Sequence, residues 1–181
     1  MTTSTRLLDA AALRRVLARM ASELVERTAD GSSVVLVGIQ RRGVQLADRL
    51  APLIEAGLER PLLRGVLDIT LYRDDLQAIG PSPIVHETRL PAGLDGATVV
   101  VVDDVLHTGR TIRAALDEIA DFARPKRILL AVLVDRGGRE LPIAADVTGL
   151  VVAAVPGDHV TVQVTEVDGE DAVLLERGGA G

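Results

Sequence analysis

Four consecutive valines run directly into two aspartates at Val99–Asp104, and few folds accommodate this arrangement. A run of β-branched residues predicts a buried strand. In open α/β sheets, ligands bind outside the carboxyl ends of such strands, so the two acids are expected to face a ligand crevice. Apolar strand-like runs alternate with helical segments over the rest of the chain, which predicts an α/β fold.

The residues after the two acids are suited to holding a phosphate. Thr108, Gly109 and Thr111 lie at the expected N-terminus of a helix. Backbone N–H groups and hydroxyls there can surround a phosphate, and glycine permits its close approach. The neighbouring carboxylates can accept protons from ribose hydroxyls. A phosphorylated sugar therefore fits the segment, and the alternative is an ordinary strand-turn-helix with solvated acids.

Periodicity and turn residues predict the other elements. Asp9 is expected to cap the first helix, which ends at Asp30-Gly31. Further helices are expected over residues 44–56 and 111–122. Strands are expected over residues 33–39, 62–71, 84–90, 97–102, 127–134, 147–155, 160–167 and 172–176.

Composition excludes several classes of protein. The chain has 181 residues, which favours a single domain, and no cysteine, which excludes disulfides and thiolate chemistry. A net charge of −6 argues against a protein whose main task is wrapping nucleic acid. Tyr72 and Phe122 are the only aromatic residues, too few for base-stacking RNA modules. No apolar run is long enough to span a bilayer, so we expect a soluble, cytoplasmic protein without membrane contact.

A second candidate loop, Gly38–Gly43, also follows a buried strand. Alone it is a weak signal, because a glycine-flanked loop with two arginines is also typical of a surface turn. Two further segments are rich in charged residues. Leu67–Leu76 runs from a predicted strand into a charged stretch, and Leu133–Ile143 carries arginines and glycines after a predicted strand. By composition alone the first of these favours a surface hairpin.

Together these four segments carry a resemblance to a known family. Asp103–Thr111 resembles the 5-phosphoribosyl-diphosphate motif of type I phosphoribosyltransferases, and Gly38–Gly43 resembles their diphosphate loop. With Leu67–Leu76 and Leu133–Ile143, the chain resembles the bifunctional pyrimidine-operon attenuator and uracil phosphoribosyltransferase family over nearly its whole length.

The resemblance implies a type I phosphoribosyltransferase fold, with a central, mainly parallel sheet flanked by helices. It also implies a single domain over residues 1–181, with a flexible lid loop at about 72–88 and a small hood at about 135–155. The implied reaction joins uracil to 5-phosphoribosyl diphosphate and yields UMP and diphosphate. Mg²⁺ is the implied cofactor, held mainly by diphosphate and ribose oxygens and water, with no dedicated protein cage. Asp103 and Asp104 would reach it through the ligand or water.

The resemblance also assigns residues by position. Asp103 and Asp104 would bind the ribose hydroxyls, and Arg42 would be the counter-ion of diphosphate. His107 either takes a proton from uracil or packs on the ligand. The catalytic set is completed by the lid residues Tyr72 and Arg73. The expected substrate-binding residues are Gly38, Ile39, Gln40, Arg41, Gly43, Val105, Leu106, Thr108, Gly109, Arg110, Thr111, Val134, Asp135 and Arg136.

The regulatory half of the resemblance implies UMP-responsive binding to an mRNA leader and a homo-oligomer, a dimer or larger. The expected RNA contacts are Arg15, Arg19, Arg27 and Arg139. Several other expected polar or basic positions are replaced, by Ala18, Ser22, Gly138, Ala144 and Leu150. Two alternatives therefore stand beside the uracil enzyme: an RNA-binding attenuator with vestigial catalysis, and a phosphoribosyltransferase for another base.

Overall fold

The computed structural model describes residues 3–72 and 87–178, and of Thr3, Leu71 and Tyr72 it describes the backbone only. It contains eight β-strands, four α-helices and one 3₁₀ helix within those ranges. In chain order these are β1 Thr3–Leu8, α1 Ala10–Thr28, β2 Val34–Ile39, α2 Arg42–Leu58, β3 Leu63–Leu67, η1 Ile69–Tyr72, β4 Thr98–Leu106, α3 Arg110–Phe122, β5 Arg127–Asp135, β6 Val147–Val151, β7 His159–Gln163, α4 Thr165–Asp168 and β8 Ala172–Arg177.

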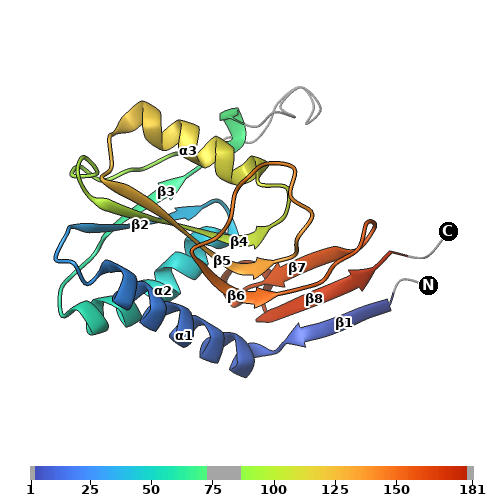
Figure 1. Cartoon of the computed structure of the whole chain (residues 1–181). Helices are drawn as coiled ribbons and strands as arrows, with labels where there is room; N and C mark the ends of the chain where they lie inside the picture. Colours follow the sequence, from blue (N-terminus) through green and yellow to red (C-terminus); the bar gives the residue numbers. More distant parts are fainter. Residues whose placement is uncertain (1–2, 73–86, 179–181) are drawn as a thin grey trace.

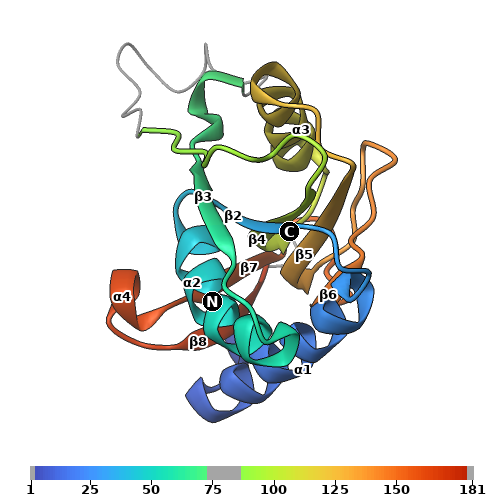
Figure 2. The same ribbon diagram turned by 90° about the vertical axis from the view of Figure 1, so that its left-hand side faces the viewer.

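A five-stranded parallel sheet forms the centre of the molecule, with strand order β3-β2-β4-β5-β6. Helices α1 and α2 cover one face and α3 lies against the other (Figures 1 and 2). The chain passes outward from β2 to β3 and then returns to the other side of β2 to form β4. The strand order therefore reverses between β2 and β4, and such a reversal is where open α/β sheets bind ligands.

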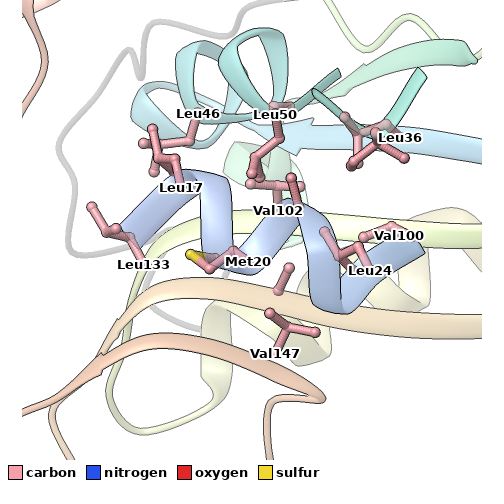
Figure 3. Packing of buried hydrophobic residues seen from close by; sticks show 14 of the residues in the cluster. Leu17, Met20, Leu24, Leu36, Leu46, Leu50, Val100, Val102, Leu133 and Val147 are labelled. Atoms are coloured by element: carbon pink, nitrogen blue, oxygen red, sulfur yellow. The ribbon is translucent and has the colours of Figure 1, made fainter. Parts of the chain in front are cut away.

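Burial on both faces of the sheet explains the run of valines in β4. Val100 and Val102 pack with α1 and α2, where Leu17, Met20 and Leu24 of α1 lie against the sheet (Figure 3). Val99 and Val101 instead pack on the opposite face, against residues of α3. A strand covered on both faces is apolar at every position, as is typical of parallel sheets.

A second, antiparallel sheet of three strands has the order β1-β8-β7. It brings the two end strands of the described chain together, because Ser4 pairs with Glu176 across β1 and β8. Its apolar residues Val162, Val173 and Leu175 join the cluster formed by α1, α2 and the central sheet. This shared core supports the expectation of a single domain.

The predicted fold class is confirmed, and most elements lie where the sequence places them. Asp9 caps α1, since its Oδ1 accepts a hydrogen bond from the backbone N–H of Ala12 at 2.8 Å. The predicted strands at 62–71 and 160–167 are too long. The first ends at Leu67, because the Asp68 carboxylate accepts a hydrogen bond from the Thr70 N–H and closes a turn.

The second overlong strand, β7, ends at Gln163, and the short helix α4 follows it. Strand β6 likewise ends at Val151, short of the predicted residue 155. The predicted strand at 84–90 is reduced to one bridge between Val66 and Arg89, and residues 84–86 lie outside the described part. Within residues 3–72 and 87–178, no helix is both long and apolar enough to cross a membrane.

Candidate active site

The two candidate motifs lie side by side at the strand-order reversal. Gly38 of β2 pairs with Val102 of β4, so the loop after β2 meets the end of β4. A Cβ atom built on Gly43 would lie 2.5 Å from the carbonyl oxygen of Val102, and one on Gly38 would lie 2.5 Å from Cα of Val44. Only glycine fits at these two positions because the loop closes on itself and on the neighbouring strand. The Gln40–Arg41 peptide bond in this loop is cis.

Asp103 and Asp104 belong to β4, which continues to Leu106. The Oδ1 atom of Asp103 accepts a hydrogen bond from the N–H of Asp104 at 3.0 Å, and Asp104 Oδ1 accepts one from Val105 N–H at 2.9 Å. Burial raises the pKa of Asp103, and the charge of Asp104 raises it further. Burial also raises the pKa of Asp104, while the charge of Arg42 opposes that rise. The pair is thus one buried and one half-buried acceptor, which a cation or hydroxyl donors would stabilise.

The segment Thr108–Thr111 forms the N-terminus of α3. Gly109 adopts a left-handed conformation with φ of 92° at the N-cap. The N–H groups of the first helical turn have no partner within the helix, and the N–H of Arg110 donates to the hydroxyl of Thr108 at 3.3 Å. Arg110 forms an ion pair with Glu140 at 2.8 Å and so closes one side. This arrangement can surround a phosphate group, as the sequence predicts.

Arg42 has a protein partner that the sequence does not reveal. Its Nε and Nη2 atoms donate to both carboxylate oxygens of Asp168, at 3.0 and 2.7 Å. This pairing raises the pKa of Arg42 and lowers that of Asp168. Within the described residues, no hydrogen bond or ion pair engages the side chain of the neighbouring Arg41, which is exposed. Of the two arginines, Arg41 is therefore the one whose donors are available to a ligand.

Asp168 is one of three acids that hold α2 from the turn between β7 and β8. Seven residues after Arg42 along α2, Arg49 donates to Glu166 at 2.9 and 2.6 Å and to Asp171 at 3.0 and 2.7 Å. These contacts lower the pKa of Asp171 to about 2. The sequence alone indicates no role for this turn, because Glu166 is 117 positions away from Arg49 in the sequence.

The start of the hood lies across the segment that follows β4. The backbone N–H groups of Glu140 and Leu141 donate to the carbonyl of Thr108, at 3.0 and 3.1 Å. The N–H of Arg136 donates to the carbonyl of Leu106 at 3.1 Å. The side chain of Val134 is buried, as are those of Leu106 and Ile39, so at these three predicted positions contact with a ligand is through the backbone.

The nitrogen atoms of Arg139 donate hydrogen bonds within the protein, whereas a contact with RNA requires donors that are available to the RNA. Its guanidinium donates to the carbonyls of Ile143 and His107, at 2.9 and 2.8 Å, and to the carboxylate of Asp135. The other carboxylate oxygen of Asp135 accepts the N–H of Gly137 at 2.9 Å. Both side chains therefore stabilise the fold of the hood.

His107 and Arg136 both lie where the hood meets the segment that follows β4. A Cβ atom on Gly138 would lie 2.8 Å from Nε2 of His107, so the imidazole occupies space that a larger residue would need. Burial lowers the pKa of His107, and the charge of Arg136 lowers it further. His107 is accordingly neutral at pH 7. The Nε atom of Arg136 is buried without a hydrogen-bond partner among the described residues.

Of the predicted RNA contacts on α1, two have protein partners. Arg19 donates to the backbone carbonyls of Thr148 and Gly149, and Arg27 forms an ion pair with Glu23 at 3.0 Å. Arg15 is exposed, with no hydrogen bond or ion pair to the described residues. The predicted lid begins at Tyr72, whose backbone closes η1, and continues at Arg73, which lies outside the described residues together with residues 74–86.

The site has no set of three or more acidic or histidine side chains within residues 3–72 and 87–178 that could hold a metal ion. The pair Asp103 and Asp104 nevertheless fits a divalent cation, since a positive charge would offset the loss of solvent that raises their pKa values. Two carboxylates suit an ion that keeps most of its ligands from substrate oxygens and water, as Mg²⁺ does.

Fold and site together define a class of protein. The model of the family described as "Phosphoribosyl transferase domain" matches residues 3–168. Hypoxanthine phosphoribosyltransferase of Trypanosoma cruzi has the same fold, with a TM-score of 0.71 over 96% of this chain and 97% of the other at 16% identity. That of Staphylococcus aureus gives a TM-score of 0.68 over 94% and 90% at 18% identity. The chain belongs to the phosphoribosyltransferase domain family.

Sequence similarity identifies the particular family. The chain is 55% identical to the bifunctional protein PyrR of Thermus thermophilus, over 96% of this chain and 97% of that protein. It is 53% identical to the bifunctional protein PyrR of a Roseiflexus species, over 95% and 94%. The chain therefore belongs to the PyrR family, which confirms the predicted family.

Proposed function

We propose that the protein transfers the phosphoribosyl group of 5-phosphoribosyl diphosphate to uracil, and that UMP controls its second activity as a regulator of pyrimidine biosynthesis genes through RNA. The observation that carries the enzymatic part is the adjacency of two loops at the strand-order reversal. One offers a pair of carboxylates, one buried and one half-buried, beside a helix N-terminus, and the other a tight glycine-flanked loop with an exposed arginine. Membership in the PyrR family supports uracil over other bases and supports the regulatory activity.

The substrate is oriented by groups of opposite polarity. The N-terminus of α3 and the hydroxyls of Thr108 and Thr111 would hold the 5′-phosphate, while Asp103 and Asp104 would accept hydrogen bonds from the ribose hydroxyls. The loop Gly38–Gly43 would receive the diphosphate, with Arg41 supplying charge. These contacts would fix C1 of the ribose between the leaving group and the hood.

In the reaction, a ring nitrogen of uracil bonds to C1 of the ribose as the bond from C1 to the diphosphate oxygen breaks. Positive charge develops on the sugar, and the carboxylates of Asp103 and Asp104 stabilise it. Negative charge develops on the leaving diphosphate, beside Arg41. The proton of the attacking nitrogen is lost, and His107, whose pKa is lowered by burial and by the charge of Arg136, would be the base that takes it. When bound, Mg²⁺ supplies charge neutralisation for the diphosphate.

The enzymatic part is tested by release of diphosphate from 5-phosphoribosyl diphosphate and Mg²⁺ with uracil, orotate, hypoxanthine or guanine. We expect turnover with uracil and a loss of roughly 100-fold or more in Asp104→Asn, since one acceptor beside the developing charge is removed. Preferred turnover with another base would replace uracil by that base. Absence of turnover with every base would leave the regulator with vestigial catalysis as the function.

The regulatory part is tested by gel-shift titration of a pyrimidine leader RNA over a range of salt. Regulation by UMP requires that UMP tightens binding, and phosphate contacts require that affinity falls with salt. Salt-insensitive binding, or binding unaffected by UMP, would contradict this part alone. Sedimentation of the same samples would test the proposed homo-oligomer.

A further inference from the structure

The guanidinium of Arg139 joins three separate stretches of backbone. It donates to Ile143 in the hood at 2.9 Å, to His107 after β4 at 2.8 Å, and to the carboxylate of Asp135 at the end of β5. Longer contacts of 3.4 and 3.5 Å reach the carbonyls of Leu106 and Gly137. One side chain thus ties the hood to the segment that follows β4 and to the end of β5.

This stretch of the hood has little other support. Residues 136–146 form neither helix nor strand, and Gly137 and Gly138 have positive φ values of 71° and 73°. The few backbone hydrogen bonds that tie it to the β4 segment end on two carbonyls, those of Leu106 and Thr108. Carbonyls in such a loop need partners, and Arg139 provides them where no strand does.

Arg139 also has few donors left for an external ligand. Its side chain is 24% exposed, and all three of its nitrogen atoms donate within the protein. Three residues earlier, the guanidinium of Arg136 has no hydrogen bond to the described residues, and its Nε atom is buried. Of the two arginines in this turn, Arg136 is therefore the one placed to contact a ligand.

We propose that Arg139 is a positioning residue for the base: it fixes the backbone of the hood, which the proposed function places across C1 of the ribose from the leaving group, and it does not contact RNA. This inference rests on the proposed function. It requires the planar, forked guanidinium, because a lysine ammonium can pair with Asp135 but cannot reach the carbonyls of Ile143 and His107 at the same time.

The test compares Arg139→Gln and Arg139→Lys with Arg6→Gln, which removes an exposed ion pair to Glu170 far from the site. In Arg139→Gln we expect KM for uracil to rise roughly 10-fold or more while KM for 5-phosphoribosyl diphosphate changes less than about 2-fold, because misplacement affects the base side only. Arg139→Lys should recover only a minor part of that rise. Arg6→Gln should match the unaltered protein.

Equilibrium binding separates failure of this inference from failure of the proposed function. Calorimetry gives the affinities of UMP and of ribose 5-phosphate, which lacks the base. If Arg139 positions the base site, the advantage of UMP over ribose 5-phosphate falls roughly 10-fold or more in Arg139→Gln, even if the protein turns over no base.

An unchanged uracil KM and an unchanged UMP advantage, together with lost binding of leader RNA, would overturn the inference and make Arg139 an RNA contact. Thermal unfolding of each variant shows whether it is folded. If Arg139→Gln is unfolded, Arg139→Lys decides, because it keeps the charge and the pairing with Asp135. Full uracil affinity in that folded variant would exclude a requirement for the fork.

Discussion

The loop after β2 and the turn after β5 carry similar residues but are held in place by different contacts. Each lies at the carboxyl edge of the sheet and carries two arginines. In each, one arginine pairs within the protein, Arg42 with Asp168 and Arg139 with Asp135, while Arg41 and Arg136 have no side-chain partner among the described residues. In each pair, one arginine already donates hydrogen bonds within the protein and the other does not. We infer that the first arginine holds the loop in shape and that its neighbour contacts the ligand.

The two loops differ in how closely they pack. The β2 loop is pressed against β4, so that the position of Gly43 leaves no room for a Cβ atom, whereas no atom lies within 4 Å of the Cβ position of Gly137 in the hood. The diphosphate side is thus fixed by backbone contact, and the base side by the side chain of Arg139. A rigid loop suits diphosphate, which leaves in phosphoribosyl transfer to any base. A turn that is held by one side chain can differ between proteins that use different bases.

The largest expected effect on stability comes from replacing each of these glycines by alanine. Gly43→Ala forces a Cβ atom against the Val102 carbonyl, and we expect it to destabilise the protein by about 3 kcal/mol. Gly137→Ala meets no atoms but must keep φ at 71°, so we expect about 1 kcal/mol. Urea unfolding of both variants measures the difference. Equal losses would show that the two loops are packed alike.

The arginines of the β2 loop provide the next comparison. Arg42→Gln leaves the half-buried Asp168 without its partner, and we expect a loss of about 2 kcal/mol in the free energy of unfolding. Arg41→Gln should change stability by less than about 0.5 kcal/mol, because its side chain is exposed and unpaired in the described structure. Diphosphate inhibition should weaken in Arg41→Gln. Stronger destabilisation by Arg41→Gln than by Arg42→Gln would reverse the proposed division of labour.

The pH dependence of ligand binding sharpens the same contrast. Burial raises the folded-state pKa values of Asp103 and Asp104, so the ligand-free protein binds protons more tightly when folded and loses stability as pH rises through those pKa values. Binding of Mg²⁺ and 5-phosphoribosyl diphosphate needs the charged carboxylates, so affinity falls as pH falls through the same range.

Because Arg42 lowers the pKa of Asp104, Arg42→Gln should move this loss of affinity to higher pH, by about one unit or less. Arg139→Gln should not move it, since the ion pair of Arg139 is with Asp135. Calorimetric titrations from about pH 5 to about pH 8 measure both variants. An identical shift in the two would place their charges equally close to the acids.

The smallest expected effect extends the comparison to α1. Arg15→Gln should change stability by less than about 0.5 kcal/mol and, if Arg15 contacts phosphate, reduce the salt dependence of RNA binding by about one counter-ion. Arg19→Gln removes donors to the carbonyls of Thr148 and Gly149 and should cost about 1 kcal/mol instead. Thermal unfolding and salt titrations of the two variants check this order.

The fold was predictable where local pattern decides structure. The valine run specified β4, and the periodic leucines with Asp9 specified α1, because burial and capping act over a few residues. Strand β1 was missed, since Thr3–Leu8 is a mixed polar edge strand whose only sheet partner among the described residues is β8, near the far end of the chain. The helical turn α4 was predicted as strand because its geometry depends on Asp168 accepting the Val164 N–H.

The site was predictable as a set of motifs, though its side-chain roles were less so. Asp103, Asp104 and the N-terminus of α3 lie together as expected, because chain order and parallel pairing place them there. Arginine is a different case, since its long side chain reaches partners from any direction. Nothing near Arg42 in sequence indicates Asp168, and nothing in the hood sequence shows that Arg139 is hydrogen-bonded within the protein while Nε of Arg136 has no partner among the described residues.

The contact between Arg42 and Asp168 has a consequence for synthesis. The two residues are 126 positions apart, so a growing chain carries the diphosphate loop long before the acid that anchors it. Until α4 is made, α2 lacks both Asp168 and the two acids that hold Arg49. A ribosome-bound intermediate that ends before α4 can form the central sheet and the contact of Gly43 with β4, but Arg42 and Arg49 still lack their acids. The side-chain anchors of α2 are therefore completed only when the end of the chain is made.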